Sequence, residues 1–318
     1  MRWAPPSGSA QAATIAGMAE AARLRYVIGI DLGGTHIKAA SVSTSGDILD
    51  HVTGETRDQA APGAWVATIR GLCAQIESAR REPAVAIGVA APGLAAPDGR
   101  SIASIPGKLA GLQGLDWAAA LDAAVPVRVL NDGHAALLGE CWRGAAAGCR
   151  DVVLLTLGTG VGGAILSDGR LLTGATGKAG HWGHMTLDPD GPPSIAGMPG
   201  SLEGAIGNCT IEARSHGRFH DTKALVEAHL AGDREATRVW MRSVYRLACA
   251  IASIANAVDP EVVILGGGIA RAGDALLQPV AGFLETVEWR PLGGVRVRLA
   301  ALGEMAGALG AAQRALLA

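Results

Sequence analysis

The sequence predicts an α/β protein made of two similar lobes. The chain has 318 residues, and a typical domain of about 150 residues gives an expectation of two domains with a cleft. Apolar runs of strand length alternate with amphipathic helical stretches, which is typical of α/β proteins. One pattern, three strands joined by a Gly/Thr turn and a Ser/Gly turn, occurs twice, in residues 29–49 and 155–172. This internal repeat predicts lobes of similar structure.

The first half of the chain begins with a three-stranded meander and continues with a helix and further strands. In the helical stretch apolar residues recur at spacings of three and four from Trp65 onward, and Pro83 then ends the helix. The Gly- and Pro-rich stretch after the fourth strand predicts a long loop of the kind used for binding. The predicted elements are strands 26–32, 36–43 and 46–55, helix 63–81, strand 84–90, loop 91–116, a short helix and strand 125–130.

The second half repeats the meander and then becomes mainly helical. The apolar stretch 247–258 is too short to cross the roughly 20-residue core of a bilayer, so it predicts a buried helix. The predicted elements are helix 132–144, strands 151–157, 161–167 and 169–174, a Gly/Pro-rich segment 174–200, helices to residue 258 with breaks near Gly217 and Gly232, strand 261–268, a helix, strand 295–300 and a final helix 304–318.

Composition excludes several classes of protein. Hydrophobic residues make up 49% and charged residues 18%, with a mean hydropathy of +0.28, which a disordered chain does not have. A net charge of −2 provides no field for a nucleic acid partner. Residues 1–24 contain Pro, Ser, Gly and Glu20 where a secretory signal needs an unbroken apolar segment, so we expect a flexible leader on a cytoplasmic protein that does not enter a membrane. The five widely spaced cysteines predict reduced thiols.

Three glycine turns follow predicted strands and are candidate phosphate sites. Glycine lets backbone N–H groups converge on one concavity, and threonine adds a hydroxyl donor, which suits polyphosphate oxygens. Each turn taken alone is also explained as a tight hairpin or strand-to-helix turn. None of them fits a P-loop or a dinucleotide-binding fingerprint. The three turns are residues 31–35, 158–163 and 266–268.

Asp132 is the candidate catalytic residue. It follows an apolar strand at the start of a predicted helix. A carboxylate within reach of a hydroxyl group can orient that hydroxyl and take its proton during phosphoryl transfer. The alternative is that Asp132 only caps the helix.

Six motifs, in order and spacing, resemble the ROK (repressor, open reading frame, kinase) sugar kinases. That family lies within the clan of actin, hexokinase and Hsp70, whose lobes are actin-like or ribonuclease H-like. The resemblance therefore implies an α/β fold with two such lobes, an interlobe cleft, a sugar in the cleft and ATP across it. The motifs are GIDLGGTHIK (29–38), GVAAPG (88–93), VRVLNDGHAALLGE (127–140), LTLGTGVGGAIL (155–166), GHMTLDPDG (183–191) and VVILGGGIA (262–270).

The resemblance also implies roles for individual residues. Asp132 would be the general base and Asn131 would hold a neighbouring hydroxyl, while Asp31 would orient water around Mg²⁺. The residues implied for ATP are Gly33, Gly34, Thr35, Gly158, Thr159, Gly160, Gly267 and Gly268. The residues implied for the sugar are Gly93, Asn131, Asp132, His181, His184 and Glu203.

One segment departs from the family pattern. Many members have Glu where this chain has His181, which leaves the preferred sugar open because a neutral imidazole offers one donor and one acceptor. Relatives with a structural zinc bind it through a histidine matching His184 and three cysteines. Here Ser194, Ala196 and Ser201 stand at the cysteine positions, and these residues cannot supply zinc ligands. The sequence therefore predicts no structural zinc, and Glu203 is expected either to bind a sugar hydroxyl or to be a surface residue.

The sequence thus predicts an ATP- and Mg²⁺-dependent phosphotransferase acting on a hexose hydroxyl, with a glucose-like substrate favoured. Kinases for N-acetylhexosamine, mannose, fructose or allose, and a sugar-binding pseudokinase, remain alternatives. A repressor is not expected, because a helix-turn-helix needs several tens of residues before the first glycine turn. The expected domains are a small lobe of residues 25–130 and 303–318 and a large lobe of residues 131–302. A homodimer is possible in this family, but no interface is indicated.

Overall fold

The computed structural model describes residues 25–57, 63–105, 107 and 109–317. The chain divides into two compact units: unit 1 runs to Leu130 and includes the chain from Ala311 onward, and unit 2 is Asn131–Gly310. The sequence placed the first boundary at the same residue and the second at residue 303. The predicted leader, residues 1–24, lies outside the described residues. No helix in the described ranges is long and apolar enough to cross a membrane.

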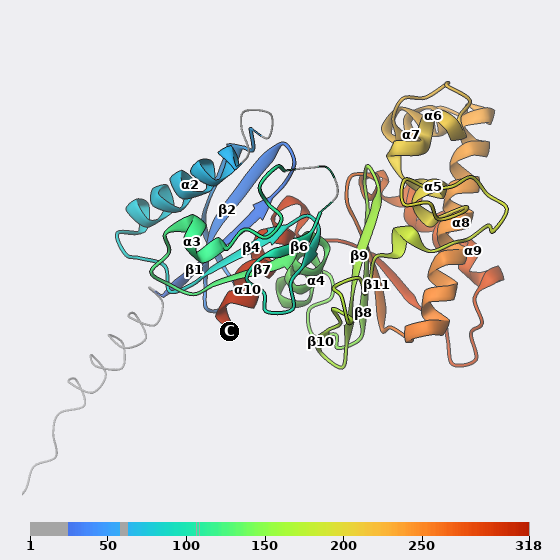
Figure 1. Ribbon diagram of the computed structural model, residues 1–318. Helices are drawn as coiled ribbons and strands as arrows, with labels where there is room; N and C mark the ends of the chain where they lie inside the picture. The colour runs from blue at the N-terminus through green and yellow to red at the C-terminus, as the bar shows by residue number, and fades with distance from the viewer. Residues whose placement is uncertain (1–24, 58–62, 106, 108, 318) are drawn as a thin grey trace, which may run out of the picture. The chain divides into compact units, whose positions relative to one another are not determined.

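Unit 1 is built on a five-stranded sheet in the order β3-β2-β1-β4-β7 (Figure 1). The first three strands form an antiparallel meander, and the fourth runs parallel to β1. Every residue of β1 except Asp31 is buried, which explains its almost continuous apolar sequence. The strands are β1 (Tyr26–Leu32), β2 (His36–Ser43), β3 (Ile48–Glu55), β4 (Ile87–Ala91) and β7 (Val127–Asn131).

Two helices pack their apolar residues into the core of unit 1. Helix α2 (Ala64–Arg80) buries Trp65, Ile69, Leu72 and Ile76, as its periodicity predicted. Helix α3 (Trp117–Leu121) contributes Trp117, whose ring centroid lies 5.4 Å from that of Trp65. The stretch predicted as a long loop contains a short antiparallel hairpin, β5 (Leu94–Ala95) and β6 (Ile102–Ser104), which the sequence missed because strands this short show no alternation.

Unit 2 repeats the strand arrangement of unit 1, so the predicted internal repeat is present in the fold. Its sheet has the order β10-β9-β8-β11-β12. Again the first three strands are an antiparallel meander, and the next strand, β11, runs parallel to the first. The strands are β8 (Val152–Leu157), β9 (Val161–Ser167), β10 (Arg170–Leu171), β11 (Val262–Gly266) and β12 (Arg296–Leu299).

The long helix of unit 2 carries much of its core. Helix α8 (Arg234–Val258) buries Trp240, Leu247 and Ile251 together with strand residues of β8 and β11, as predicted for the apolar stretch 247–258. The remaining helical elements are α4 (Asp132–Arg143), η1 (Trp182–His184), α5 (Leu202–Ile206), η2 (Asn208–Thr210), α6 (Ile211–Arg214), α7 (Thr222–Leu230), η3 (Ile269–Ala272), α9 (Asp274–Val287), η4 (Gly303–Met305) and α10 (Ala306–Leu316).

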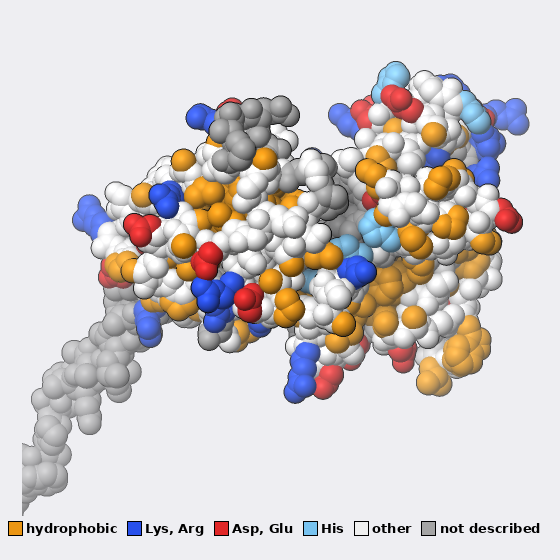
Figure 2. Space-filling model, viewed as in Figure 1, with side chains coloured by type: hydrophobic (Ala, Val, Ile, Leu, Met, Phe, Trp, Pro, Cys, Tyr) orange, Lys and Arg blue, Asp and Glu red, His pale blue; other side chains and the backbone are white. Residues whose placement is uncertain are grey.

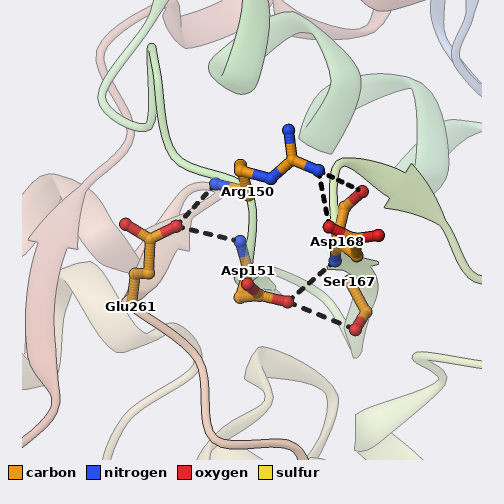
Figure 3. A network of polar contacts seen from close by, with 5 residues as sticks. All are labelled: Arg150, Asp151, Ser167, Asp168 and Glu261. Carbon is orange, nitrogen blue, oxygen red and sulfur yellow. Dashed lines mark hydrogen bonds and ion pairs between the residues drawn. The ribbon is translucent and has the colours of Figure 1, made fainter.

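A polar network joins the ends of three neighbouring strands, β9, β8 and β11, at one end of the unit 2 sheet (Figure 3). Glu261 accepts hydrogen bonds from the backbone N–H groups of Arg150 and Asp151, just before β8. Asp151 in turn accepts from the Ser167 hydroxyl and the Asp168 N–H, at the β9–β10 turn. The network holds the meander in register with the start of β11, and it is structural.

Glu140 is a fully buried carboxylate that joins α4 to the chain leading into α10. Its oxygens accept backbone N–H groups of Ala145 at 2.7 Å, Ala301 at 3.1 Å and Leu302 at 2.9 Å. These donors satisfy a charge that would otherwise be costly to bury.

We expect Glu140→Gln to destabilise the protein by about 1–3 kcal/mol, because its amide NH₂ must face a backbone donor in place of a carboxylate oxygen. Thermal unfolding measures this change. The exposed Glu285→Gln is the control and should stay within about 0.5 kcal/mol of the wild type. Equal melting temperatures for the two variants would contradict the assigned role of Glu140.

Helices α4 and α10 approach each other through glycine. A Cβ atom built on Gly310 would lie 1.7 Å from the carbonyl oxygen of Ala135, and one on Gly139 would lie 2.4 Å from that of Ala306. Both clashes are with backbone atoms, which cannot move aside as a flexible side chain does. This close seam holds the helix that begins at Asp132.

Candidate functional site

The start of α4 places two candidate residues side by side. Asn131 is the N-cap of the helix, and its Oδ1 accepts from the N–H groups of Gly133 at 2.9 Å and His134 at 3.2 Å. The interpretation of Asp132 as the cap is therefore wrong: Asp132 is the first helical residue, and its Oδ1 accepts from the Gly133 N–H at 2.8 Å. The Asn131 side chain also hydrogen-bonds to Asp132. Asn131 thus holds both the helix start and the carboxylate.

The environment of Asp132 raises the pKa of its carboxyl group above the ordinary value of 3.8. The main cause is desolvation by the surrounding protein, which disfavours the charged form. The Gly133 N–H, the electrostatic interaction with the His181 imidazole when that ring is protonated, and the Asn131 side chain oppose this rise without cancelling it. The side chain still reaches solvent. A carboxylate that is accessible yet poorly hydrated has the properties of a general base.

Three histidines form a row in unit 2 near this carboxylate. The ring centroids of His134 and His181 lie 6.5 Å apart, edge to face, and those of His181 and His184 lie 6.4 Å apart, stacked. His134 is buried and its Nε2 donates to the Ala179 carbonyl at 3.1 Å. Histidine side chains also reach the surface in Figure 2, where they are pale blue, and His184 is exposed.

The charge state of the row is set by burial. Burial lowers the pKa of His134, and burial followed by the charge of His184 lowers the pKa of His181. Both rings are therefore neutral at pH 7. The Nδ1 atom of His181 is buried with no hydrogen-bond partner. A neutral imidazole in this row can exchange hydrogen bonds with hydroxyl groups as donor and acceptor.

The second glycine turn, between β8 and β9, presents its amides in one direction. The Gly158 carbonyl accepts from the Asn208 N–H at 2.9 Å, and the Thr159 carbonyl accepts from the Cys209 N–H at 2.8 Å. In a planar trans peptide the N–H points opposite to the C=O. The N–H groups of Thr159 and Gly160 therefore point away from η2. Two adjacent amides aimed to one side are a suitable site for phosphate oxygens.

Glu203 braces the same turn. Its Oε2 accepts the Val161 N–H at 3.0 Å, and a Cβ atom on Gly160 would lie 2.2 Å from this oxygen. Gly160 is thus required for the carboxylate to approach the turn. The half-buried Glu203 therefore contacts the glycine turn predicted to bind ATP. The sequence predicted a sugar-binding role for Glu203 and did not predict this contact.

The second and third glycine turns line one cavity of about 630 Å³ in unit 2. Gly158, Thr159 and Gly268 contribute from the turns. Gly267 has φ +86° and lies against the end of β8, where a Cβ atom would be 2.4 Å from the Leu157 carbonyl oxygen. The rest of the lining was not predicted from the sequence; it comes from η2, α7 and η3 and includes Asn208, Thr222, Lys223 and Arg271.

Unit 1 holds the other predicted residues. In the first glycine turn, Thr56 donates its hydroxyl to the Gly33 carbonyl at 2.6 Å and its N–H to the Thr35 carbonyl at 2.9 Å. By the same peptide geometry the N–H of Gly34 points away from Thr56. Thr56, which is fully buried, was not predicted. Gly93 has φ +101°, and a Cβ atom there would lie 2.6 Å from the Ser104 carbonyl oxygen, so the β5–β6 hairpin requires glycine.

The segment that departs from the zinc pattern is held by hydrogen bonds. The Ser194 N–H donates to the Met198 carbonyl at 2.8 Å, and the Ser194 hydroxyl accepts from the N–H groups of Ala196 and Met198. The Gly200 N–H donates to the Pro192 carbonyl at 2.9 Å. Within the described part of the chain, no group of three or more His, Cys, Asp or Glu side chains is placed to hold a metal ion. That the protein binds no structural zinc stays a prediction.

A family model described as the ROK family matches residues 27–317. The chain belongs to the ROK family. This ROK protein is 33% identical to a glucokinase of Halalkalibacterium halodurans over 90% of the chain and 93% of the relative. It is also 33% identical to an N-acetylmannosamine kinase of Escherichia fergusonii, over 77% of the chain and 84% of the relative.

A solved structure supports the same fold. The crystal structure of a ROK family glucokinase from Streptomyces griseus in complex with glucose and AMPPNP matches with a TM-score of 0.75 and 28% identity, covering 92% of this chain and 100% of that one. The fold of this ROK protein is therefore the predicted actin-like α/β fold. The roles of its individual site residues stay predictions.

We predict that Gly160→Ala weakens ATP binding about tenfold, because the new methyl group displaces the Glu203 carboxylate and leaves the Val161 N–H without its acceptor. Calorimetric titration with ATP measures the effect. In a Glu203→Ala background the methyl group has room, so the same change should cost much less. Equal effects of Gly160→Ala in both backgrounds would rule out the steric cause.

Proposed function

We propose that this protein is an ATP-dependent sugar kinase that transfers the γ-phosphoryl group to a hexose hydroxyl, with a glucose-like sugar favoured and Asp132 as the general base. The observation that carries the proposal is the Asp132 carboxyl: it is held by Asn131 and Gly133, reaches solvent and has a raised pKa. The glucokinase relative and the glucokinase structure with glucose and AMPPNP support the sugar phosphotransferase activity.

Asp132 acts on the attacking hydroxyl group. It accepts the hydroxyl proton while a bond forms between the sugar oxygen and the γ-phosphorus, and the bond from that phosphorus to the bridging oxygen breaks to leave ADP. The poor hydration that raises its pKa makes the ionised carboxylate a stronger base than an ordinary aspartate. Asn131 fixes its orientation from the N-cap position.

Backbone amides bind the phosphates of the donor. The N–H groups of Thr159 and Gly160 in unit 2, and that of Gly34 in unit 1, supply donors that require no side-chain ordering. Asp31 is the next-to-last residue of β1, where the first glycine turn begins, and a carboxylate is an oxygen ligand suited to Mg²⁺ held through water. When bound there, Mg²⁺ would neutralise charge on the β- and γ-phosphates. The nucleoside fits the cavity lined by Gly268 and α7.

The sugar is bound by groups of mixed hydrogen-bond character. His181 and His184 offer imidazole donors and acceptors, and the Glu203 carboxylate accepts from hydroxyl groups. Each hexose hydroxyl is both a hydrogen-bond donor and an acceptor, so it can bond to either kind of group in this set. A second candidate substrate is an N-acetylhexosamine, since an N-acetylmannosamine kinase is among the relatives and an imidazole N–H can donate to an acetamide carbonyl, which a carboxylate cannot do.

Release of ADP across a panel of sugars tests the proposal. A coupled assay with ATP and Mg²⁺ over glucose, N-acetylmannosamine, mannose, fructose and allose should give the highest kcat/KM with glucose. Highest turnover with N-acetylmannosamine would select the second candidate instead. Saturable sugar binding without ADP release from any sugar would identify a sugar-binding pseudokinase and overturn the kinase assignment.

A further inference from the structure

Arg214, at the end of α6, is a partly buried cation whose hydrogen-bond acceptors are neutral oxygens. Nη2 donates to the carbonyls of Ile206 at 3.2 Å and Gly207 at 2.9 Å. Nε donates to the Thr210 hydroxyl at 3.1 Å and Nη1 to the Ser243 hydroxyl of α8 at 2.6 Å. Burial lowers the pKa of the guanidinium to about 10, so it stays charged at pH 7.

The carbonyl group held by Arg214 belongs to a peptide that also contacts the second glycine turn. The Gly207 C=O accepts from Arg214, and the N–H of the same peptide, that of Asn208, donates to the Gly158 carbonyl at 2.9 Å. The N–H at the far end of the Gly158–Thr159 peptide points away from η2, by the geometry of a trans peptide. The guanidinium, two peptide groups and the Thr159 N–H therefore form one aligned chain of donors and acceptors.

Such a chain transmits charge as well as position. Hydrogen bonds in series polarise one another, and each peptide dipole here has its negative end toward Arg214 and its positive end toward the glycine turn. Because neutral acceptors hold the guanidinium, no carboxylate among those partners cancels its field. The elements that carry the chain are neighbours in unit 2, since η2 contacts both α5 and α6; the two helices are labelled in Figure 1.

We propose that Arg214 is a positioning residue for the phosphoryl donor, acting through the Gly207–Asn208 and Gly158–Thr159 peptides on the Thr159 amide. The inference rests on the proposed function and adds a residue that does not line the donor cavity. It assigns Arg214 an effect on the anionic phosphates and none on the nucleoside or the sugar.

Calorimetric titration of Arg214→Met with ATP and with adenosine tests the proposal. We expect the Kd for ATP to rise about tenfold, the worth of a hydrogen bond to a charged group, while the Kd for adenosine, which lacks phosphates, changes less than about twofold. In turnover the KM for ATP should rise and the KM for the hexose should not. Arg214→Lys keeps the charge without the planar fork and should weaken ATP about threefold; it is the deciding variant if the methionine protein does not fold.

Ser243→Ala is the matched control. It removes one acceptor of the same guanidinium from a buried position, since Ser243 is 3% exposed, and it leaves the Gly207 contact intact. Its ATP affinity should match the wild type even where its melting temperature falls. The proposal is overturned if Ser243→Ala weakens ATP as much as Arg214→Met, or if the Arg214 variants weaken adenosine equally or leave ATP binding unchanged. A wild type that binds neither ATP nor adenosine would instead refute the proposed function, and the inference with it.

Discussion

Asp132→Asn is expected to lower kcat by about 100- to 10,000-fold, the range for loss of a general base. Asn keeps the size of the side chain and an oxygen that can accept from the Gly133 N–H, so binding of sugar and ATP should persist. The measurement is kcat by ADP release beside calorimetric Kd values for both substrates. Loss of both Kd values together with kcat would show that the substitution disturbs binding rather than proton transfer.

The same variant should be more heat-stable than the wild type at neutral pH. The folded-state pKa of Asp132 is raised, so its stabilising contribution is present when the carboxyl is protonated and is lost as the pH rises through that raised pKa. Asn is neutral at every pH and avoids the loss. The difference in melting temperature should shrink as the pH falls below the raised pKa, and kcat of the wild type should fall over the same pH range. A variant that is less stable at pH 7 would contradict this sign.

Gly310→Ala is expected to destabilise the protein by about 3 kcal/mol, because its methyl group meets the Ala135 backbone carbonyl and the two helices must separate. For a unit of this size that corresponds to about 6–12 °C in melting temperature. Activity should also fall, since α4 carries Asp132 at its first position. Thermal unfolding and the ADP-release assay measure the two effects.

Gly282→Ala provides the control for the helix seam. Gly282 lies in α9 with open space where its Cβ atom would be, so the exchange should raise stability by about 0.5–1 kcal/mol through helix propensity. Opposite signs for Gly310→Ala and Gly282→Ala separate close packing from backbone entropy. A stabilised Gly310→Ala protein would show that the seam is looser than described.

The sequence predicted the repeated meanders and the glycine turns because both depend on local rules. Buried strands require apolar runs, and turns such as that at Gly267 require a residue without Cβ. It offered Asp132 as a possible helix cap, whereas the cap is the preceding residue, Asn131; both residue types cap helices well. The Gly133 N–H donates to both side chains, so the hydrogen bond from the His134 N–H to Asn131 is what identifies Asn131 as the cap.

The supports behind the glycine turns were beyond sequence reasoning. Thr56 holds the first turn from 21 to 23 positions along the chain, and η2 holds the second from 50 positions away. Neither Thr56 nor the η2 segment lies in a sequence pattern that differs from an ordinary loop. Their roles come from tertiary proximity, which periodicity and turn propensities do not contain.

The division of α10 between the two units has a consequence for synthesis on the ribosome. Residues 131–310 are contiguous, so unit 2 is complete in the nascent chain before unit 1, although unit 1 is made first. Unit 1 needs Ala311 and Ala312, both fully buried, and its strand β4 packs Gly88 against the Ala311 carbonyl. The packing of unit 1 can therefore be completed only after the chain from Ala311 onward has been made.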